Sequence, residues 1–195
     1  MDCPELLIIR HGETHWNLQG RMQGALDSAL TDQGLNQACV LNDILKRAGL
    51  DGRYRAWCSP QGRAQHTAQI ALAGHFTTWQ TDARLAEVSV GRYEGLLFED
   101  AMAEHALSYP DDGPFDWLFH APGGESWEAF HGRVHAWLTA LEGPSVVVTH
   151  GITSRVLRMI ALGLERTQIA DLPGGQGIIH RIRGGRAEIL APKPA

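Results

Sequence analysis

The chain lacks the segments that mark membrane and secreted proteins. No apolar run approaches the ~20 residues that cross a bilayer, and the first residues lack the basic-then-apolar pattern of a signal peptide. Its three cysteines, Cys3, Cys39 and Cys58, are an odd number without metal-ligand spacing, which favours reduced thiols over disulfides. We therefore expect a cytoplasmic protein without a membrane partner.

An excess of basic charge is also absent. The formal net charge is −5 at pH 7, which argues against a general surface for nucleic acid or anionic membranes. Repeats, low-complexity tracts and linkers are missing too. The 195 residues, 44% of them hydrophobic, suffice for one domain that buries roughly 70% of its unfolded surface. The sequence predicts a single domain over residues 1–195 and leaves its oligomeric state open, a homodimer included.

The most informative stretch is LIIRHGET at residues 7–14. In it, an apolar run typical of a buried strand ends at Arg10, His11 and Gly12. Open α/β sheets place their chemistry just past the carboxyl ends of such strands, and a glycine lets the backbone turn close to a ligand. A cation, an imidazole and a bare backbone at that position predict a site for an anion, with phosphate as the leading candidate.

A second strand ends in the same way. The β-branched run before His150 and Gly151 reads as a short strand, and a helical pattern follows as far as Leu162. A helix that begins after Gly151 would aim unpaired N–H groups and a positive dipole end at an anion. Two histidine–glycine pairs at strand ends are hard to attribute to packing alone, so we interpret both as parts of one site.

Further short motifs follow in a fixed order along the chain. After the first block come GRMQG at 20–24, Ser59-Pro60 with Arg63, Glu87, PGGES at 122–126, and His150-Gly151 with Arg155. In this order the set closely resembles the histidine phosphatase superfamily, which includes the cofactor-dependent phosphoglycerate mutases. Ala29, Gln61 and His66 depart from the usual pattern, at positions that the family does not use for chemistry.

Periodicity and end signals predict the order of the elements. Strands are expected at 5–9, 55–58, 77–81 and 144–149 and as a hairpin over 178–182 and 187–190, and helices over 31–48, 60–72 and 151–162 and after a cap at Ser126. Strands alternating with helices predict an α/β fold with three layers, in which helices cover both faces of a mostly parallel sheet with an antiparallel edge. The resemblance implies the same phosphoglycerate mutase-like architecture.

The resemblance also implies catalytic roles. The family uses the histidine of its Arg-His-Gly motif to form a phosphohistidine, which makes His11 the expected nucleophile. A neutral imidazole can attack phosphorus if an acceptor, for instance a backbone carbonyl, holds its other nitrogen. His150 would donate to a phosphoryl oxygen, and Glu87 resembles the family's proton donor to the leaving oxygen. Glu13 is the rival acid, although its place in the loop favours a local pairing role.

Several side chains and backbone groups are candidates for binding the phosphoryl group. Arg10 and Arg63 can each present a planar guanidinium to two oxygens, as lysine could not. The remaining candidates are donors from loops and from the start of a helix: Asn17, Gln23, Gly24 and Gly151. Asn17 could instead only organise a turn, and Gln23 and Gly24 could be ordinary loop residues.

Two other classes of function compete with a phosphohistidine enzyme. His11 and His15 stand four residues apart with Glu13 between them, but zinc helices place glutamate directly after the first histidine, and Gly12 is a poor helix residue. We therefore expect no metal and no cofactor. A phospho-ligand binding module without catalysis would be favoured by the loss of His11, Arg63 or Glu87, and all three are present.

A variable segment at about 93–124 lies where the family builds its substrate lid. Residues 93–132 contain no lysine or arginine but nine acidic residues: Glu94, Glu99, Asp100, Glu104, Asp111, Asp112, Asp116, Glu125 and Glu128. A phosphoglycerate mutase needs extra cations to retain a phosphorylated acid between half-reactions, so this composition favours hydrolysis over mutase-type transfer. The partner predicted is a small phosphorylated metabolite. The segment's aromatic residues would suit an apolar, aromatic or cationic alcohol part, as in a ribazole-like ester, if they contact the substrate.

Overall fold

One six-stranded sheet organises the chain. The computed structural model describes residues 3–109 and 115–193, and the strands lie in the order β3-β2-β4-β1-β5-β6. The strands β3, β2, β4 and β1 pair in parallel, whereas β5 and β6 add an antiparallel edge. This confirms the predicted fold class. The strands are β1 (Leu6–Arg10), β2 (Arg55–Cys58), β3 (Gln80–Thr81), β4 (Ser145–Thr149), β5 (Ile179–Arg183) and β6 (Arg186–Leu190).

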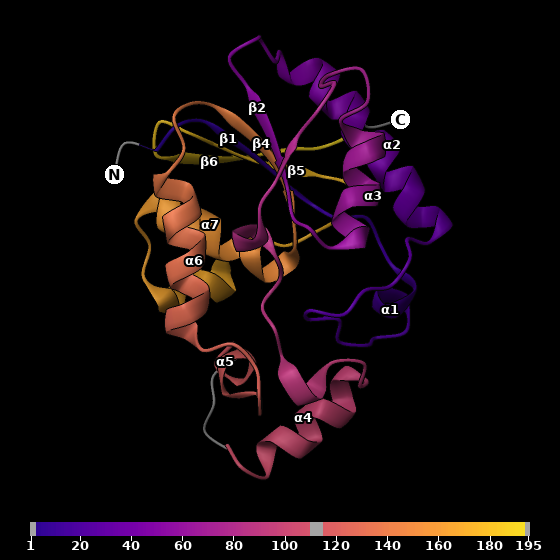
Figure 1. Ribbon diagram of the computed structural model, residues 1–195, viewed down its shortest axis with the longest axis vertical. Helices are drawn as coiled ribbons and strands as arrows, with labels where there is room; N and C mark the ends of the chain where they lie inside the picture. The colour runs from indigo at the N-terminus through magenta and orange to yellow at the C-terminus, as the bar shows by residue number, and fades with distance from the viewer. Residues whose placement is uncertain (1–2, 110–114, 194–195) are drawn as a thin grey trace.

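Helices cover both faces of the sheet (Figure 1). On one face lie α2 (Asp32–Ala48) and α3 (Gly62–Ala71), and on the other α6 (Trp127–Thr139) and α7 (Gly151–Leu162). The period of two along a strand divides the apolar side chains between these layers. In β1, Leu6 and Ile8 pack into the core beneath α6 and α7, whereas Leu7 and Ile9 pack into the core beneath α2 and α3.

The long helices begin and end where the sequence predicts. The Thr31 side chain accepts a hydrogen bond from the Gly34 N–H at the start of α2, and Ser126 accepts one from Ala129 at the start of α6. Gly49 and Gly163 follow α2 and α7 with φ of 72° and 67°, a left-handed conformation that favours glycine. Among the described residues, no helix is both long and apolar enough to cross a membrane.

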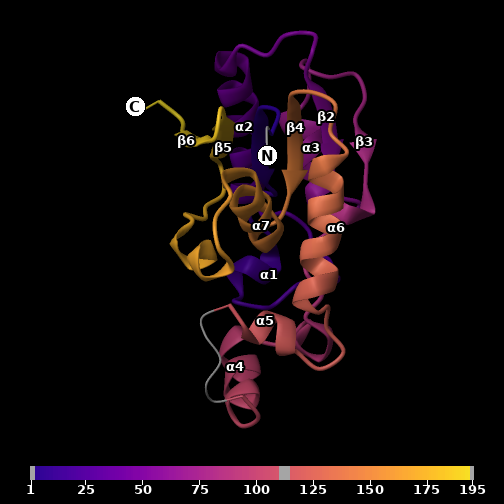
Figure 2. The same cartoon turned by 90° about the vertical axis from the view of Figure 1, so that its left-hand side faces the viewer.

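The short helices gather at one end of the molecule. The helix α1 (His15–Leu18) follows the loop that leaves β1. The helices α4 (Phe98–Ala106) and α5 (Trp117–His120) lie beyond the sheet, at the same end of the molecule as α1 (Figures 1 and 2). Short 3₁₀ helices complete the description: Ala83–Leu85, Gly91–Tyr93 and Arg166–Asp171. We call α4 and α5 the cover. Asp111 and Asp112 of the acidic segment lie outside the described residues.

Two predicted elements are shorter than expected. The strand predicted at 77–81 pairs only over Gln80–Thr81, at the sheet edge. The helix predicted to begin near Pro60 begins at Gly62, because the backbone of Gln61 is extended rather than helical. The Gln61 side chain makes no cap bond; the Asp27 carboxylate accepts from the Arg63 N–H instead.

Candidate active site

Three neighbouring parallel strands bring the predicted residues together. In the register of the sheet, Arg10 lies beside Thr149, and Cys58 lies beside Val148. The chain leaves β1 at His11, β4 at His150 and β2 at Ser59, so the three side chains emerge at the same edge. The backbone continues the pairing for one more residue, because the His11 N–H donates to the Thr149 carbonyl over 2.9 Å.

The His11 ring is buried and held in one tautomer. Its Nδ1 lies 2.7 Å from the Gly12 carbonyl oxygen, and a carbonyl can only accept, so Nδ1 carries the proton in the neutral ring. Burial and the nearby Arg10 and Arg63 guanidinium groups hold the pKa of His11 well below its ordinary value. The ring is therefore neutral at pH 7 and leaves Nε2 with a lone pair, as attack on phosphorus requires.

The His150 ring lies beside His11, but its two nitrogens have different partners from those of His11. The ring centroids are 5.2 Å apart, and burial with the Arg63 charge lowers the pKa of His150 well below its ordinary value. Its Nε2 lies 2.7 Å from the Ser59 hydroxyl, whereas Nδ1 is buried without a hydrogen-bond partner among the described residues. If the hydroxyl donates to Nε2, then Nδ1 carries the proton and can donate to a phosphoryl oxygen.

Two buried arginines face the same place. The Nε atoms of Arg10 and Arg63 are buried without a hydrogen-bond partner in the part of the chain that the structure describes. The other Arg63 nitrogens donate to the carbonyls of Leu26 and Gly24 over 2.6 and 3.0 Å and pair with Asp27 over 3.1 Å. Arg63 therefore holds the loop over 24–27 and still has a free donor. With His150 Nδ1, the site has three buried unpaired N–H groups, which an anion would satisfy.

Glu87 occupies the start of α7 and corrects one expectation. Its Oε2 accepts from the Ile152 N–H over 3.0 Å, and Oε1 accepts from the N–H and hydroxyl of Thr153 and from the N–H of Val88. The predicted unpaired N–H groups at this helix start are therefore bonded to a carboxylate of the protein. The dipole end of α7 attracts the Glu87 side chain itself. No hydrogen bond within the described part of the chain joins Glu87 to the Gly151 N–H, and Gly151 lies beside the Arg10 guanidinium.

The glycine after His11 has a different reason from the one predicted. A Cβ on Gly12 would lie 2.4 Å from the Gly34 carbonyl oxygen, so close packing against α2 requires glycine here. The Gly12 N–H donates to the Thr67 hydroxyl over 3.0 Å. We expected the missing Cβ to make room for a ligand, whereas the structure uses it to pack the motif loop against a helix.

Asn17 makes the turn-forming contacts that were considered and also lines a cavity. Its Oδ1 accepts from the Thr14 N–H in a capping box at α1, which is the turn-forming role, and from Gln176 Nε2 over 3.3 Å. The amide group of Asn17 remains a donor, and the residue lines the cavity described next. Glu13 is instead bonded through Oε1 to the Thr31 hydroxyl over 2.7 Å, which supports its local pairing role.

A cavity of about 210 Å³ lies over His11. Four residues form what we call the floor: Arg10, His11, Arg63 and Glu87. Asn17, Gln23 and Gly24 line the cavity as the sequence predicts, together with Arg21. Seven apolar residues form what we call the apolar wall: Met22, Val88, Val90, Phe98, Trp117, Leu118 and Ile152. The cover therefore contributes three side chains to the cavity that contains His11.

Sequence reasoning missed several supporting residues. Gln61 donates to the Gly24 carbonyl and accepts from the Glu87 N–H, so this departure from the family pattern connects two parts of the site. Gln176 donates to the His11 carbonyl over 3.0 Å. Neither residue stands in a motif. For Gln61, a polar residue where the pattern has leucine was the available signal.

The alternative metal site is not assembled. His11 is buried whereas His15 is exposed on α1, and no group of three or more His, Cys, Asp or Glu side chains in residues 3–109 and 115–193 could hold a metal ion.

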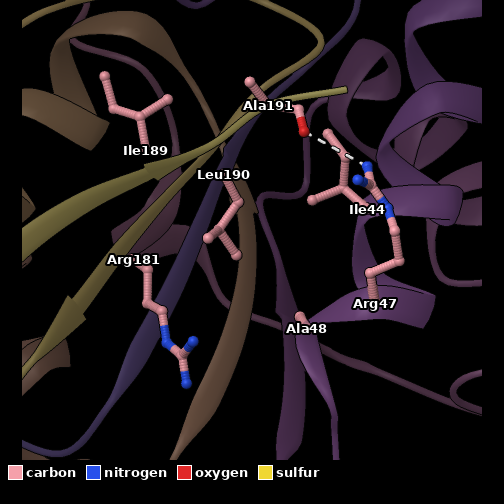
Figure 3. A pocket seen from close by; sticks show the side chains of 7 residues that line it. All are labelled: Ile44, Arg47, Ala48, Arg181, Ile189, Leu190 and Ala191. Carbon is pink, nitrogen blue, oxygen red and sulfur yellow. Dashed lines mark hydrogen bonds between the residues drawn. The ribbon is translucent and has the colours of Figure 1, made fainter. Parts of the chain in front are cut away.

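A second hollow, between α2 and the sheet edge (Figure 3), is lined by aliphatic residues with Arg47 and Arg181. Arg47 donates to the Ala191 carbonyl there and Arg181 pairs with Glu5, so these guanidinium groups are engaged within the protein.

Comparisons with known proteins agree with the geometry. The family model for the histidine phosphatase superfamily (branch 1) matches residues 6–189. The chain belongs to this superfamily. The adenosylcobalamin/alpha-ribazole phosphatase of Salmonella typhimurium is 34% identical over 170 residues, 82% of this chain and 82% of that one. A Caenorhabditis elegans 6-phosphofructo-2-kinase/fructose-2,6-bisphosphatase is 30% identical over 171 residues, 86% of this chain, but the chain spans only 35% of that relative.

The fold comparison agrees as well. The alpha-ribazole phosphatase of Shigella flexneri superposes with a TM-score of 0.80 at 27% identity, over 97% of this chain and 96% of that one. Because the family and its relatives are phosphatases and mutases, the chain is an enzyme of the histidine phosphatase type.

Proposed function

We propose that the protein is a metal-independent phosphomonoesterase that hydrolyses a small phosphorylated metabolite through a phosphohistidine on His11. One observation carries this proposal. The neutral His11 ring has its Nδ1 proton on the Gly12 carbonyl, and the buried donors Arg10 Nε, Arg63 Nε and His150 Nδ1 are unpaired within the described residues. A nucleophilic nitrogen amid unpaired donors suits a phosphoryl group, whose oxygens carry charge throughout the transfer.

The proposed reaction has two steps. In the first, His11 Nε2 attacks phosphorus, the phosphorus–oxygen ester bond breaks, and Glu87 gives its proton to the leaving alkoxide. In the second, water attacks the phosphohistidine, Glu87 takes a proton from that water, and inorganic phosphate leaves. We assign the proton to Glu87 Oε2, which accepts only from the Ile152 N–H among the described residues, since Oε1 accepts from the N–H groups of both Val88 and Thr153. The arginines and His150 would hold the phosphoryl oxygens in both steps.

Hydrolysis is supported better than mutase-type transfer. A mutase must retain a phosphorylated acid between its half-reactions, which requires cations above the floor. Above the floor, Arg21 is the one lysine or arginine among the described residues that line the cavity. Its guanidinium already donates to the Gly95 carbonyl over 2.8 Å and to Gln19 over 3.1 Å. An acid intermediate would find few partners, so water would take the phosphoryl group.

The test is hydrolysis of an aryl phosphate by the purified protein in the presence and absence of a chelator. We expect equal rates, because no step in the proposed reaction uses a metal ion. Activity that a chelator removes and a divalent cation restores would overturn the phosphohistidine mechanism. The same assay with a phosphorylated acid and its unphosphorylated acceptor would detect transfer, which the proposal predicts to be slower than hydrolysis.

A further inference from the structure

The apolar wall contains two large aromatic side chains, Phe98 and Trp117, and core packing does not account for the exposure of Phe98. Phe98 begins α4 and is 51% exposed, and its ring lies 5.6 Å from that of Trp117, the first residue of α5, in an edge-to-face arrangement. Both rings line the cavity that contains His11. Large exposed apolar side chains gathered at a cavity mark binding surfaces more often than scattered ones do.

The loops that carry the phosphate-binding candidates present further apolar side chains. Leu18, which follows Asn17, is 68% exposed, and Leu26, in the loop held by Arg63, is 46% exposed. Exposed leucines therefore occur in both of these loops. Leu18 and Leu26 do not line the cavity itself, so the apolar surface inside it comes from the apolar wall.

Charges near the mouth disfavour a second anion on the ligand. Glu99 and Asp100 follow Phe98 in the first turn of α4 and are exposed, and Arg21 is committed to Gly95 and Gln19. A carboxylate placed against the apolar wall would lose water without gaining a strong partner, which is costly for a charged group.

From these contacts we propose that the apolar wall is a subsite for an uncharged aromatic alcohol group, so that the substrate is an aromatic phosphomonoester rather than a phosphorylated acid. This inference rests on the proposed phosphatase function, since the floor must hold the phosphoryl group. The aromatic ring would lie against Phe98 and Trp117, with Met22 and Val90 completing its environment. Aromatic pairs in such edge-to-face or offset geometry add to the gain from burial.

The subsite is tested by binding of non-hydrolysable phosphonates to the full chain. Three ligands share the same phosphonate: ethylphosphonate, 2-phenylethylphosphonate and 2-carboxyethylphosphonate. Burying a phenyl ring predicts about ten- to hundred-fold tighter binding of the phenylethyl compound than of the ethyl compound. Calorimetry should also give it a more negative heat-capacity change, the sign of apolar burial. The carboxyethyl compound should bind no more tightly than the ethyl one.

Two variants locate the effect. Phe98→Ala and Trp117→Ala should each reduce the advantage of the phenylethyl compound by about three- to ten-fold and weaken ethylphosphonate binding much less. Leu107→Ala is the matched control, because Leu107 is the C-cap residue of α4, is 86% exposed and does not line the cavity. This control should bind all three compounds as the parent protein does.

Three results would overturn the subsite: equal affinity for the ethyl and phenylethyl compounds, tighter binding of the carboxyethyl compound, or equal weakening of all ligands by Phe98→Ala and Trp117→Ala. Hydrolysis is scored separately with ethyl phosphate and 2-phenylethyl phosphate. If neither ester is hydrolysed while the phenylethyl phosphonate binds more tightly, the proposed function fails and the subsite stands. If both esters are hydrolysed with the same kcat/KM, the function stands and the subsite fails.

Discussion

The floor and the cover of the cavity are held in place by different parts of the molecule. Arg10 is the last residue of β1 and His11 follows it, and His150 follows the last residue of β4. Both histidines are 3% exposed or less. Phe98 and Trp117 come from two short helices beyond the sheet, and Phe98 is half exposed. Sheet pairing fixes Arg10 and His11 directly, whereas the cover is joined to the rest of the molecule by side-chain packing, as between Phe119 and Phe130 of α6. We infer that the floor determines the reaction and the cover determines which alcohol is accepted.

The strongest test of this division is His11→Ala. Because the proposed phosphohistidine cannot form, turnover of every phosphomonoester should fall by at least about 10⁴-fold. Rapid quenching should trap acid-labile, base-stable phosphate on the parent protein and none on the variant. His15→Ala is the matched control, four residues away and exposed, and should keep both label and turnover. Label that persists in His11→Ala would assign the nucleophile to another residue.

The next effect should depend on the leaving group. Glu87→Gln keeps an acceptor oxygen for the start of α7 but cannot donate the carboxyl proton. We expect about 10²–10⁴-fold slower hydrolysis of an alkyl phosphate and a much smaller change for an activated aryl phosphate, whose leaving oxygen needs no proton. Steady-state kcat for the two esters checks this. Equal losses for both would remove Glu87 as the proton donor and make Glu13 the next residue to test.

Arg63→Ala should behave in the opposite manner. In the proposed reaction its guanidinium faces the phosphoryl group that all substrates share, so alkyl and aryl esters should slow equally, by about 10²–10³-fold. Arg63→Lys retains the charge without the planar fork and should recover only part of the rate. Since Arg63 also holds the loop over 24–27, Asp27→Asn serves as a control for loop order. A loss in Arg63→Ala confined to one ester would mean that Arg63 contacts the alcohol part instead.

The same comparison shows what sequence could predict. The strand-end motifs predicted that His11 and His150 lie together, and their ring centroids are 5.2 Å apart. This could be predicted because strand, turn and glycine signals are local and parallel strands end at a common edge. The hydrogen-bond partners that orient the site residues are distant in sequence, as with Ser59 and His150, and no periodic pattern predicts such pairs. For the cover, the resemblance predicted a variable substrate-lid segment whose aromatic residues could contact the alcohol part. Its helices contain nine and four residues, too short for a clear period, so Phe98 could not be assigned to the cavity.

The buried imidazole of His180, in β5, should make the free energy of unfolding depend on pH in the acid range. Burial and the neighbouring Arg158 lower the pKa of His180 to about 4, and Arg158 donates to its Nδ1 over 3.3 Å. The unfolded chain, with an ordinary histidine pKa of about 6.5, binds more protons below that pH, so this contribution is present above about pH 6.5 and is lost as the pH falls toward 4. The loss is about 1.4 kcal/mol per pH unit.

His180→Gln isolates this contribution. Urea unfolding at about pH 7 and pH 5 should give a stability loss on acidification that is smaller in the variant by about 2 kcal/mol. Only the difference between the two pH values is compared, because the substitution also changes packing. An unchanged acid loss would mean that His180 is protonated in the folded protein, and that its contact with Arg158 does not persist in solution.

The smallest effect should come from the residue that joins floor and loop. The Gln61 side chain donates to the Gly24 carbonyl over 2.8 Å and accepts from the Glu87 N–H over 2.7 Å, so it positions the proton donor without lining the cavity. Gln61→Leu should lower kcat for an alkyl phosphate by about three- to ten-fold with little change in KM, and affect an activated aryl ester less, because only the former needs a well-placed proton. Gln61→Glu keeps the acceptor for the Glu87 N–H and should recover most of the alkyl rate. A purely structural role would instead slow both esters alike and lower the urea midpoint of Gln61→Leu, and that result would separate Gln61 from the positioning of Glu87.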